Sequence, residues 1–287
     1  NLPRLGEAEI TARLKYLGFG VVPLEKEKRL SVTVPSWRCW EIRGEQDMVE
    51  EVARAHGLSK VKMELPPLTH EPAEESPCER LRTAAEPVLL GNGFSEVLTK
   101  IFYSGEHVEL LTELDPTLQE QHIRVKNSLE GAYSHLKVTN VLHLAQIAAQ
   151  SARHGVTSVK VYEFGRFFSA IPRAHEAFEH ERMMLTLAAS GRWCEGEWRK
   201  SESLEERVQS FRGVLDSLAR SFGHDLEVVE GKHPFLHPGI SSSLRCGRTV
   251  VGSFGVLHPT IGAFYDLRSE VCYAELDIEA LSMLVQD

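Results

Sequence analysis

The chain has 287 residues, enough for one large domain or two smaller ones with separate hydrophobic cores. Hydrophobic residues make up 42% and charged residues 25%, a composition typical of folded globular proteins that excludes disordered and collagen-like chains. Asp and Glu number 41 against 32 Lys and Arg, and the resulting net charge of −9 argues against an autonomous nucleic-acid-binding protein.

The sequence contains no apolar run of about 20 residues and no secretory signal, so we expect no association with membranes. Its five cysteines are widely spaced and form no CxxC pair. This favours reduced thiols and a cytoplasmic location over a disulfide framework or a zinc site. The chain begins at Asn1 without an initiator methionine, which we interpret as a piece of a longer protein.

Residues 1–65 predict a small α+β domain. Apolar residues at helical spacing indicate a helix over 7–17, and alternating apolar residues indicate a strand over 30–34. A second helix is expected over 47–56, ending before Gly57. Residues 66–78 are rich in proline and glutamate, and we interpret them as a linker.

Residues 79–287 predict a larger α+β domain. Because helices separate its strands irregularly, without a repeated βαβ rhythm, we expect a mostly antiparallel sheet flanked by helices. The helix expected over 137–154 has a broad apolar face, which predicts burial against a second helix or a partner chain. Helices are also expected over 79–90 and 204–222, and strands over 94–103, 158–164, 183–189, 250–256 and 272–278.

Two histidine motifs are weak candidates for metal binding. The sequence from His175 to His180 is one residue longer than a zinc-protease HExxH motif, so its two histidines would not share a helix face. His233 and His237 are four residues apart, but a proline follows each of them and argues against a regular helix. The sequence also lacks the GxSxG, GxGxxG and GxxxxGK[ST] motifs of nucleophile-elbow, Rossmann and P-loop proteins.

Four carboxylates gather around the start of the second helix: Glu41, Asp47, Glu50 and Glu51. If Asp47 opens this helix, Glu50 and Glu51 follow one turn later, and their hard oxygen ligands suit Mg²⁺. The same residues also fit helix capping, because acidic groups stabilise a helix N-terminus without any metal. From spacing alone, capping is the favoured interpretation.

Two groups of short motifs follow one another in the order seen in a known family. The first group comprises VPSWR at 34–38, DMVEEVAR at 47–54 and Gly57. The second comprises GFSEV at 93–97, YEFGRFF at 162–168, HPG at 237–239 and GVLHP at 255–259. From near residue 5 to near residue 280, the chain therefore resembles the bacterial phenylalanyl-tRNA synthetase beta subunit, namely its fifth domain followed by its class II synthetase-like domain.

The resemblance implies a non-catalytic subunit that packs against a catalytic alpha subunit in a tetramer of two alpha and two beta chains. The whole enzyme charges tRNA with phenylalanine and uses ATP at the alpha-subunit site. No catalytic or ATP-binding residue is expected in this chain, because it lacks the glycine-spaced arginines of a working class II site. Contact with tRNA is expected through the whole enzyme, and the apolar face of 137–154 becomes a candidate subunit interface.

The resemblance also implies a Mg²⁺ site, shared with the alpha subunit, on Glu41, Asp47, Glu50 and Glu51, which reverses the preference for capping. The sequence departs from the family at Glu41, where one additional residue and a glutamate replace the usual Arg-x-Asp-Ile. It departs again at Lys137, where the family often has an arginine that could contact the interface bidentately. Two alternatives remain open: a free-standing class II-like ligase with its own ATP site, and a nucleic-acid-binding module built on the first domain.

Overall fold

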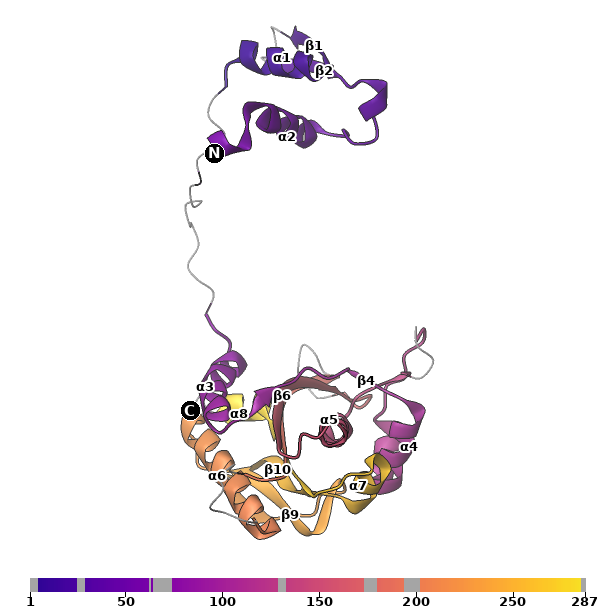
Figure 1. Ribbon diagram of the computed structural model, residues 1–287, viewed down its shortest axis with the longest axis vertical. Helices are drawn as coiled ribbons and strands as arrows, with labels where there is room; N and C mark the ends of the chain where they lie inside the picture. The colour runs from indigo at the N-terminus through magenta and orange to yellow at the C-terminus, as the bar shows by residue number, and fades with distance from the viewer. Residues whose placement is uncertain are drawn as a thin grey trace. The chain divides into compact units, whose positions relative to one another are not determined.

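The computed structural model describes residues 5–24, 29–61, 63, 74–128, 133–172, 180–193 and 202–284 (Figure 1). The chain divides into two compact units, Asn1–Ala73 and Glu74–Asp287. Most of the predicted linker lies outside the described residues, but its last two residues begin helix α3 (Pro77–Gly91). This helix starts early because the Ser76 hydroxyl accepts a hydrogen bond from the backbone N–H of Glu79 (3.2 Å) and proline suits the first helical position.

The first unit packs two helices against a β-hairpin. Its strands pair antiparallel, and the unit is centred on Leu14, Phe19 and Val21. The helices and strand predicted here are confirmed within two residues at each end, whereas β1 has no predicted counterpart because Pro23 interrupts its apolar pattern. The elements are α1 (Glu7–Tyr16), β1 (Gly20–Leu24), β2 (Arg29–Thr33), η1 (Ser36–Arg38), α2 (Glu45–His56) and η2 (Leu58–Lys60).

The second unit is built on a seven-stranded sheet, which agrees with the predicted mostly antiparallel sheet. Every neighbouring pair is antiparallel except β3 and β6, which run parallel, so the sheet is mixed at one edge. The four strands predicted between 158 and 278 are all confirmed. In spatial order the strands are β3 (Ser95–Glu96), β6 (Val159–Phe168), β7 (Glu181–Ser190), β11 (Val271–Asp277), β10 (Thr249–Leu257), β9 (Leu236–Cys246) and β8 (Glu227–Glu230).

Helices cover both faces of this sheet (Figure 1). One face packs against α3, α6 (Leu204–Phe222) and α8 (Ile278–Leu284), and the other against α4 (Gly105–Leu114), α5 (Val141–Arg153) and α7 (Pro259–Tyr265). The side chains of each strand alternate between the two resulting cores, as the pleat of a β-strand requires. Within the described ranges, no helix is both long and apolar enough to cross a membrane.

Two predictions for the second unit need correction. The strand expected over 94–103 is divided into β3 and β4 (Phe102–Tyr103), and β4 pairs with β5 (His135–Leu136) away from the main sheet. The helix expected over 137–154 begins only at Val141. Its apolar face is already covered by β6, β7, β11 and α7 of the same unit, so the interpretation of this face as a subunit interface is wrong.

Candidate functional site

The predicted acidic site of the first unit contains two arginines as well as carboxylates. Arg38 binds Glu51 in a bidentate arrangement, with nitrogen–oxygen distances of 2.6 and 2.9 Å. The same guanidinium donates to Glu41 at 2.9 and 3.2 Å, and Arg54 donates to Glu51 at 2.7 Å. The structure therefore joins Glu41 and Glu51 through Arg38, which binds both oxygens of Glu51 and the Oε2 atom of Glu41.

Asp47 helps to cap α2, but it does not open the helix as its spacing predicts, because the N-cap is Gly44 and Asp47 lies in the first turn. Its Oδ2 atom accepts hydrogen bonds from the backbone N–H groups of Arg43 (2.7 Å) and Gly44 (2.8 Å) at the start of α2. These two bonds lower the pKa of Asp47, because they favour the ionised carboxylate. The cap also explains why α2 begins at Glu45, two residues before Asp47. Glu50 lies on the exposed surface of the same helix.

The arginines determine the electrostatics of the buried carboxylate Glu51. Hydrogen bonds from Arg38 lower its pKa to about 2, against the opposing effect of burial, and Arg54 adds to the shift. Within the described part of the chain, no group of three or more His, Cys, Asp or Glu residues could hold a metal ion. Glu51 therefore does not fit that ion in this arrangement, since two guanidinium groups bind its oxygens. Glu41 and Asp47 each have one oxygen engaged, by Arg38 and by backbone N–H groups respectively.

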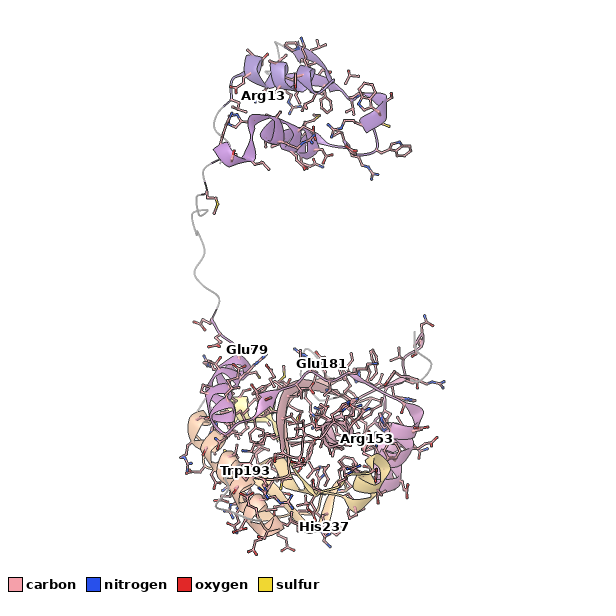
Figure 2. All side chains as sticks on the ribbon, viewed as in Figure 1. Arg13, Glu79, Arg153, Glu181, Trp193 and His237 are labelled. Atoms are coloured by element: carbon pink, nitrogen blue, oxygen red, sulfur yellow. The ribbon has the colours of Figure 1, made fainter. Side chains whose placement is uncertain are left out.

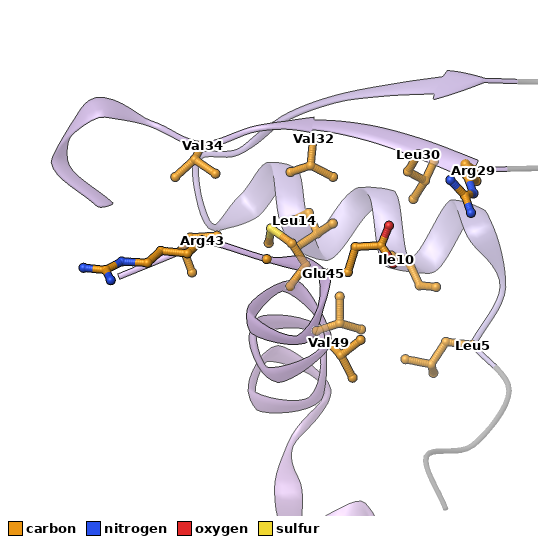
Figure 3. Close-up of a pocket in the computed structure, with 14 residues that line it drawn as sticks. Leu5, Ile10, Leu14, Arg29, Leu30, Val32, Val34, Arg43, Glu45 and Val49 are labelled. Carbon is orange, nitrogen blue, oxygen red and sulfur yellow. The ribbon is translucent and has the colours of Figure 1, made fainter. Parts of the chain in front are cut away.

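An open apolar hollow of about 620 Å³ lies in the first unit between α1, β2 and α2. Ile10, Leu14 and Val32 face it from α1 and the hairpin, and Val49 faces it from α2 (Figure 3). The hollow exists because this unit has few fully buried apolar side chains, as expected of a domain this small.

In the second unit, a row of buried polar residues crosses the centre of the sheet. Glu163 on β6 lies directly opposite Thr186 on β7, which in turn lies opposite Glu275 on β11. All three side chains point to the face covered by α5, and each is less than 9% exposed. Charged residues are rarely buried unless they are paired, so this row requires internal partners.

Lys137 supplies the cation for this row. Its ammonium group, which is fully buried, donates to Glu163 (3.0 Å), Thr99 (2.9 Å) and Asn140 (3.2 Å), so all three of its protons have acceptors. Burial lowers the pKa of Lys137, although Glu163 opposes this shift. The pKa of Glu163 is also lowered, because Lys137 and the hydrogen bonds from Thr99 and Asn140 outweigh burial.

Glu275 is satisfied by neutral donors. The hydroxyl groups of Thr139 and Tyr273 both donate to its Oε1 atom, and the backbone N–H of Asn140 lies 3.4 Å from the same atom. Burial and the neighbouring Glu275 raise the pKa of Tyr273, which keeps the phenol protonated as a donor. The interpretation of Lys137 as an interface contact is therefore wrong, since this residue belongs to a closed internal network.

Two buried histidines lie beside the network, and the sequence motifs did not indicate them. His143 on α5 and His107 on α4 both pack against the ring of Tyr103, with centroids 4.9 and 5.3 Å away. Burial lowers the pKa of His143 to about 4, and the nearby Lys137 and His107 contribute in the same direction. The sequence signal that could have revealed this cluster is polar residues within apolar segments, such as Glu163 in β6 and His143 in α5.

The two weak histidine motifs do not form a metal site in the described residues. The stretch 173–179 lies outside them, and His180 contacts the backbone oxygen of Ser169 through Nδ1 (2.9 Å). His237 (labelled in Figure 2) lies on β9, where its Nδ1 accepts a hydrogen bond from the backbone N–H of Gly239 (3.0 Å). His233 precedes β9, and burial lowers its pKa.

Comparison with solved structures shows the class of fold first. The chain is similar to the pyrrolysyl-tRNA synthetase of Desulfitobacterium hafniense, with a TM-score of 0.58 at 16% identity over 98% of this chain and 89% of that chain. It is also similar to the Giardia lamblia prolyl-tRNA synthetase in complex with prolyl-adenylate, with a TM-score of 0.56 at 10% identity over 71% of this chain and 44% of that one. The fold is that of the class II aminoacyl-tRNA synthetases.

Sequence comparison then identifies the family. The family model described as "Phenylalanyl tRNA synthetase beta chain CLM domain" matches residues 61–278. The family model described as "tRNA synthetase B5 domain" matches residues 4–58. The phenylalanine–tRNA ligase beta subunit of Geobacter metallireducens is 30% identical over 284 residues, and that of Syntrophotalea carbinolica is 28% identical over 290 residues. The chain belongs to the phenylalanyl-tRNA synthetase beta chain family, which confirms the resemblance found in its motifs.

The match covers nearly all of this chain but only part of its relatives. It includes 97% and 98% of this chain, but 34% and 35% of those two beta subunits. The chain therefore spans about a third of the length of the curated relatives it matches.

Proposed function

We propose that this chain is a non-catalytic part of a phenylalanine–tRNA ligase and supports the alpha subunit in a tetramer of two alpha and two beta chains. The complete enzyme joins phenylalanine to tRNA. ATP, with the magnesium ion that accompanies its phosphates, is used at the alpha-subunit site. The chain works in the cytoplasm, where its described cysteines, Cys39, Cys78, Cys246 and Cys272, remain free thiols.

The observation that carries this proposal is the closed polar network on the class II-like sheet. Lys137, Glu163 and Glu275 are buried charged residues at the centre of that sheet, and each is bound by side chains of the same chain. A site that holds phosphate needs accessible cationic donors, usually arginine in a bidentate arrangement. Here the buried cation is used to neutralise Glu163, which suits a structural scaffold better than a second ATP site.

Exposed apolar residues offer surfaces on which the alpha subunit can pack. Leu98 is 87% exposed in the segment between β3 and β4, beside an apolar hollow of about 560 Å³ that Ile101 and Phe102 help to line. In the first unit, Trp37 and Trp40 are 74% and 81% exposed. Tryptophan is enriched among the few residues that contribute most of the binding energy in protein interfaces, and Leu98 is the most exposed large apolar residue beside the hollow, so these positions are the first to test.

The test is light scattering after gel filtration, with the chain mixed with the alpha subunit of its own organism. We expect a stable complex that weakens at least tenfold when Leu98→Asp or Trp40→Ser is introduced. Val250→Asp is the matched control, because Val250 is 59% exposed on β10 and stands outside both surfaces. The absence of a complex, both with this chain and with the full-length beta subunit that contains it, would refute the proposed role.

The same preparation decides between this role and its two alternatives. Saturable binding of ATP by the chain alone would favour a free-standing class II-like ligase. Binding of tRNA that weakens steeply with added salt would favour a nucleic-acid-binding module. We expect neither, because the net charge is −9 and the buried network leaves Lys137 no proton to donate to a phosphate.

A further inference from the structure

Both carboxylate oxygens of Glu51 are bound by arginine side chains. Its Oε1 atom accepts from Arg38, and its Oε2 atom accepts from both Arg38 and Arg54. The side chain of Glu51 is only 6% exposed, so water does not compete strongly for these positions. Bidentate pairs between arginine and a carboxylate are among the strongest hydrogen-bonded contacts in proteins.

Arg38 is itself held firmly in place. Besides its bonds to Glu51 and Glu41, its guanidinium lies over the ring of Phe19, 5.5 Å from the ring centre. Phe19 belongs to the core of the first unit, so the arginine connects three parts of this unit: the segment after η1, the helix α2 and the hydrophobic core. A metal ion would have to displace a side chain that is fixed from several sides.

A magnesium ion is poorly matched to this cluster. Mg²⁺ requires nearly octahedral oxygen ligands at about 2.0–2.1 Å, whereas the two oxygens of Glu51 face guanidinium groups. Two positive charges already lie within 2.9 Å of the Glu51 carboxylate, and they would repel a divalent cation. Asp47 is also engaged, since its Oδ2 atom caps α2.

We propose that Arg38, by binding Glu51 and Glu41, keeps these carboxylates from forming the Mg²⁺ site that the family resemblance implies. Arg38 fastens the segment from η1 to Glu41 onto α2, and because it withholds Glu51 the carboxylates Glu41, Asp47, Glu50 and Glu51 do not assemble as a magnesium site in this chain. The inference depends on the geometry of the first unit alone and stands or falls separately from the proposed role in a ligase.

The test uses the complete 287-residue chain and Mn²⁺, whose electron paramagnetic resonance signal reports binding in place of Mg²⁺. We expect the wild type to show no saturable Mn²⁺ site with a dissociation constant below about 1 mM. Arg38→Gln removes the cation that joins Glu41 and Glu51, so this variant gains Mn²⁺ affinity at least tenfold. Arg82→Gln is the matched control, because Arg82 also binds two carboxylates, Glu86 and Glu96. That variant binds Mn²⁺ no better than the wild type.

Thermal unfolding provides a second readout that does not depend on ligase activity. The melting temperature of the wild type stays the same in Mg²⁺ and in EDTA at equal ionic strength. Arg38→Gln melts at a lower temperature, and Mg²⁺ restores part of the loss. If Arg38→Gln does not fold, Arg38→Lys takes its place, since a single ammonium group cannot make the bidentate contact.

The proposal is overturned if the wild type binds Mn²⁺ with a dissociation constant below about 1 mM and Asp47→Asn or Glu51→Gln abolishes this binding. It is equally overturned if such binding appears in the complex of the chain with the alpha subunit and Asp47→Asn removes it there. A folded Arg38 variant with no gain in affinity also contradicts it, because Arg38 would then not be the group that excludes the metal.

Discussion

Replacing Lys137 by methionine tests whether the buried polar row holds the second unit together. The substitution keeps the length and most of the volume of the side chain but removes its ammonium group. It leaves Glu163, which is 4% exposed, without the cation that lies 3.0 Å from its Oε1 atom. Hydrogen bonds from Asn140 (2.7 Å) and Thr99 (3.3 Å) remain, but neither donor carries a charge.

The expected cost follows from this burial. Breaking a buried ion pair by removing one partner destabilises a protein by about 3–5 kcal/mol, because the remaining charge is desolvated and unpaired. In a unit of this size, 1 kcal/mol lowers the melting temperature by about 2–4 °C, so we expect a decrease of about 6–20 °C. The double variant Lys137→Met/Glu163→Gln should recover part of the loss, with a coupling energy of about 1–3 kcal/mol.

Urea unfolding followed by circular dichroism measures these free energies. Arg166→Gln is the control on the same strand, since Arg166 forms an ion pair with Glu181 (2.8 Å) in which Arg166 is largely exposed. Exposed pairs contribute less than about 1 kcal/mol, so this variant should unfold close to the wild type. Equal costs for Lys137→Met and Arg166→Gln, or purely additive effects in the double variant, would show that the buried pair is not what stabilises the sheet.

Three further substitutions test other parts of the second unit. His143 has a pKa of about 4 in the folded chain, so the unfolded chain takes up a proton first as the pH falls. Stability should therefore be lost between about pH 6.5 and 4, by up to about 3 kcal/mol, and His143→Phe should flatten this dependence in unfolding curves at pH 7 and 5. Gly191→Ala should destabilise by about 1–3 kcal/mol more than Gly155→Ala in thermal melts. Both glycines have positive φ, but a Cβ at Gly191 would lie 1.9 Å from the backbone oxygen of Thr157, whereas at Gly155 it meets no atom within 4 Å. Ser203→Ala should cost about 1 kcal/mol in urea unfolding, because it removes the N-cap of α6, and a change below about 0.3 kcal/mol would contradict this.

Helices and strands were predictable from the sequence where nearby residues mark both their start and their end. Helix α6 runs over Leu204–Phe222, as predicted, because a capping box of Ser203 and Glu206 starts it and Gly223, in the left-handed conformation, ends it. The central strands of the sheet were equally clear, since runs of mostly apolar residues mark them. The prediction of one strand over 94–103 failed because the apolar residues spread along this segment do not reveal that the chain leaves one sheet and joins another.

The same limit applies to the candidate site, because local sequence patterns do not show which distant segments come into contact. The sequence identified Glu41, Asp47, Glu50 and Glu51 as neighbours, and the local spacing correctly indicated that Asp47 takes part in a helix cap. It placed Asp47 at the N-cap itself, however, whereas that position is Gly44. It did not reveal that Arg38, 13 residues before Glu51, binds that carboxylate, since such a contact depends on how the segment after η1 folds back onto α2.

The sequence by itself determined the family, the class of fold and most of the regular elements, because these follow from ordered motifs and from periodic burial. Only the tertiary structure decided where the charges are neutralised. Lys137 meets Glu163 from 26 residues away, and Glu275 meets Thr139 from 136 residues away. The tertiary structure also decided that the apolar face of α5 is buried within the second unit. The physical reason is that helical or strand periodicity shows that a face is buried, whereas the partner that buries it comes from packing between distant segments.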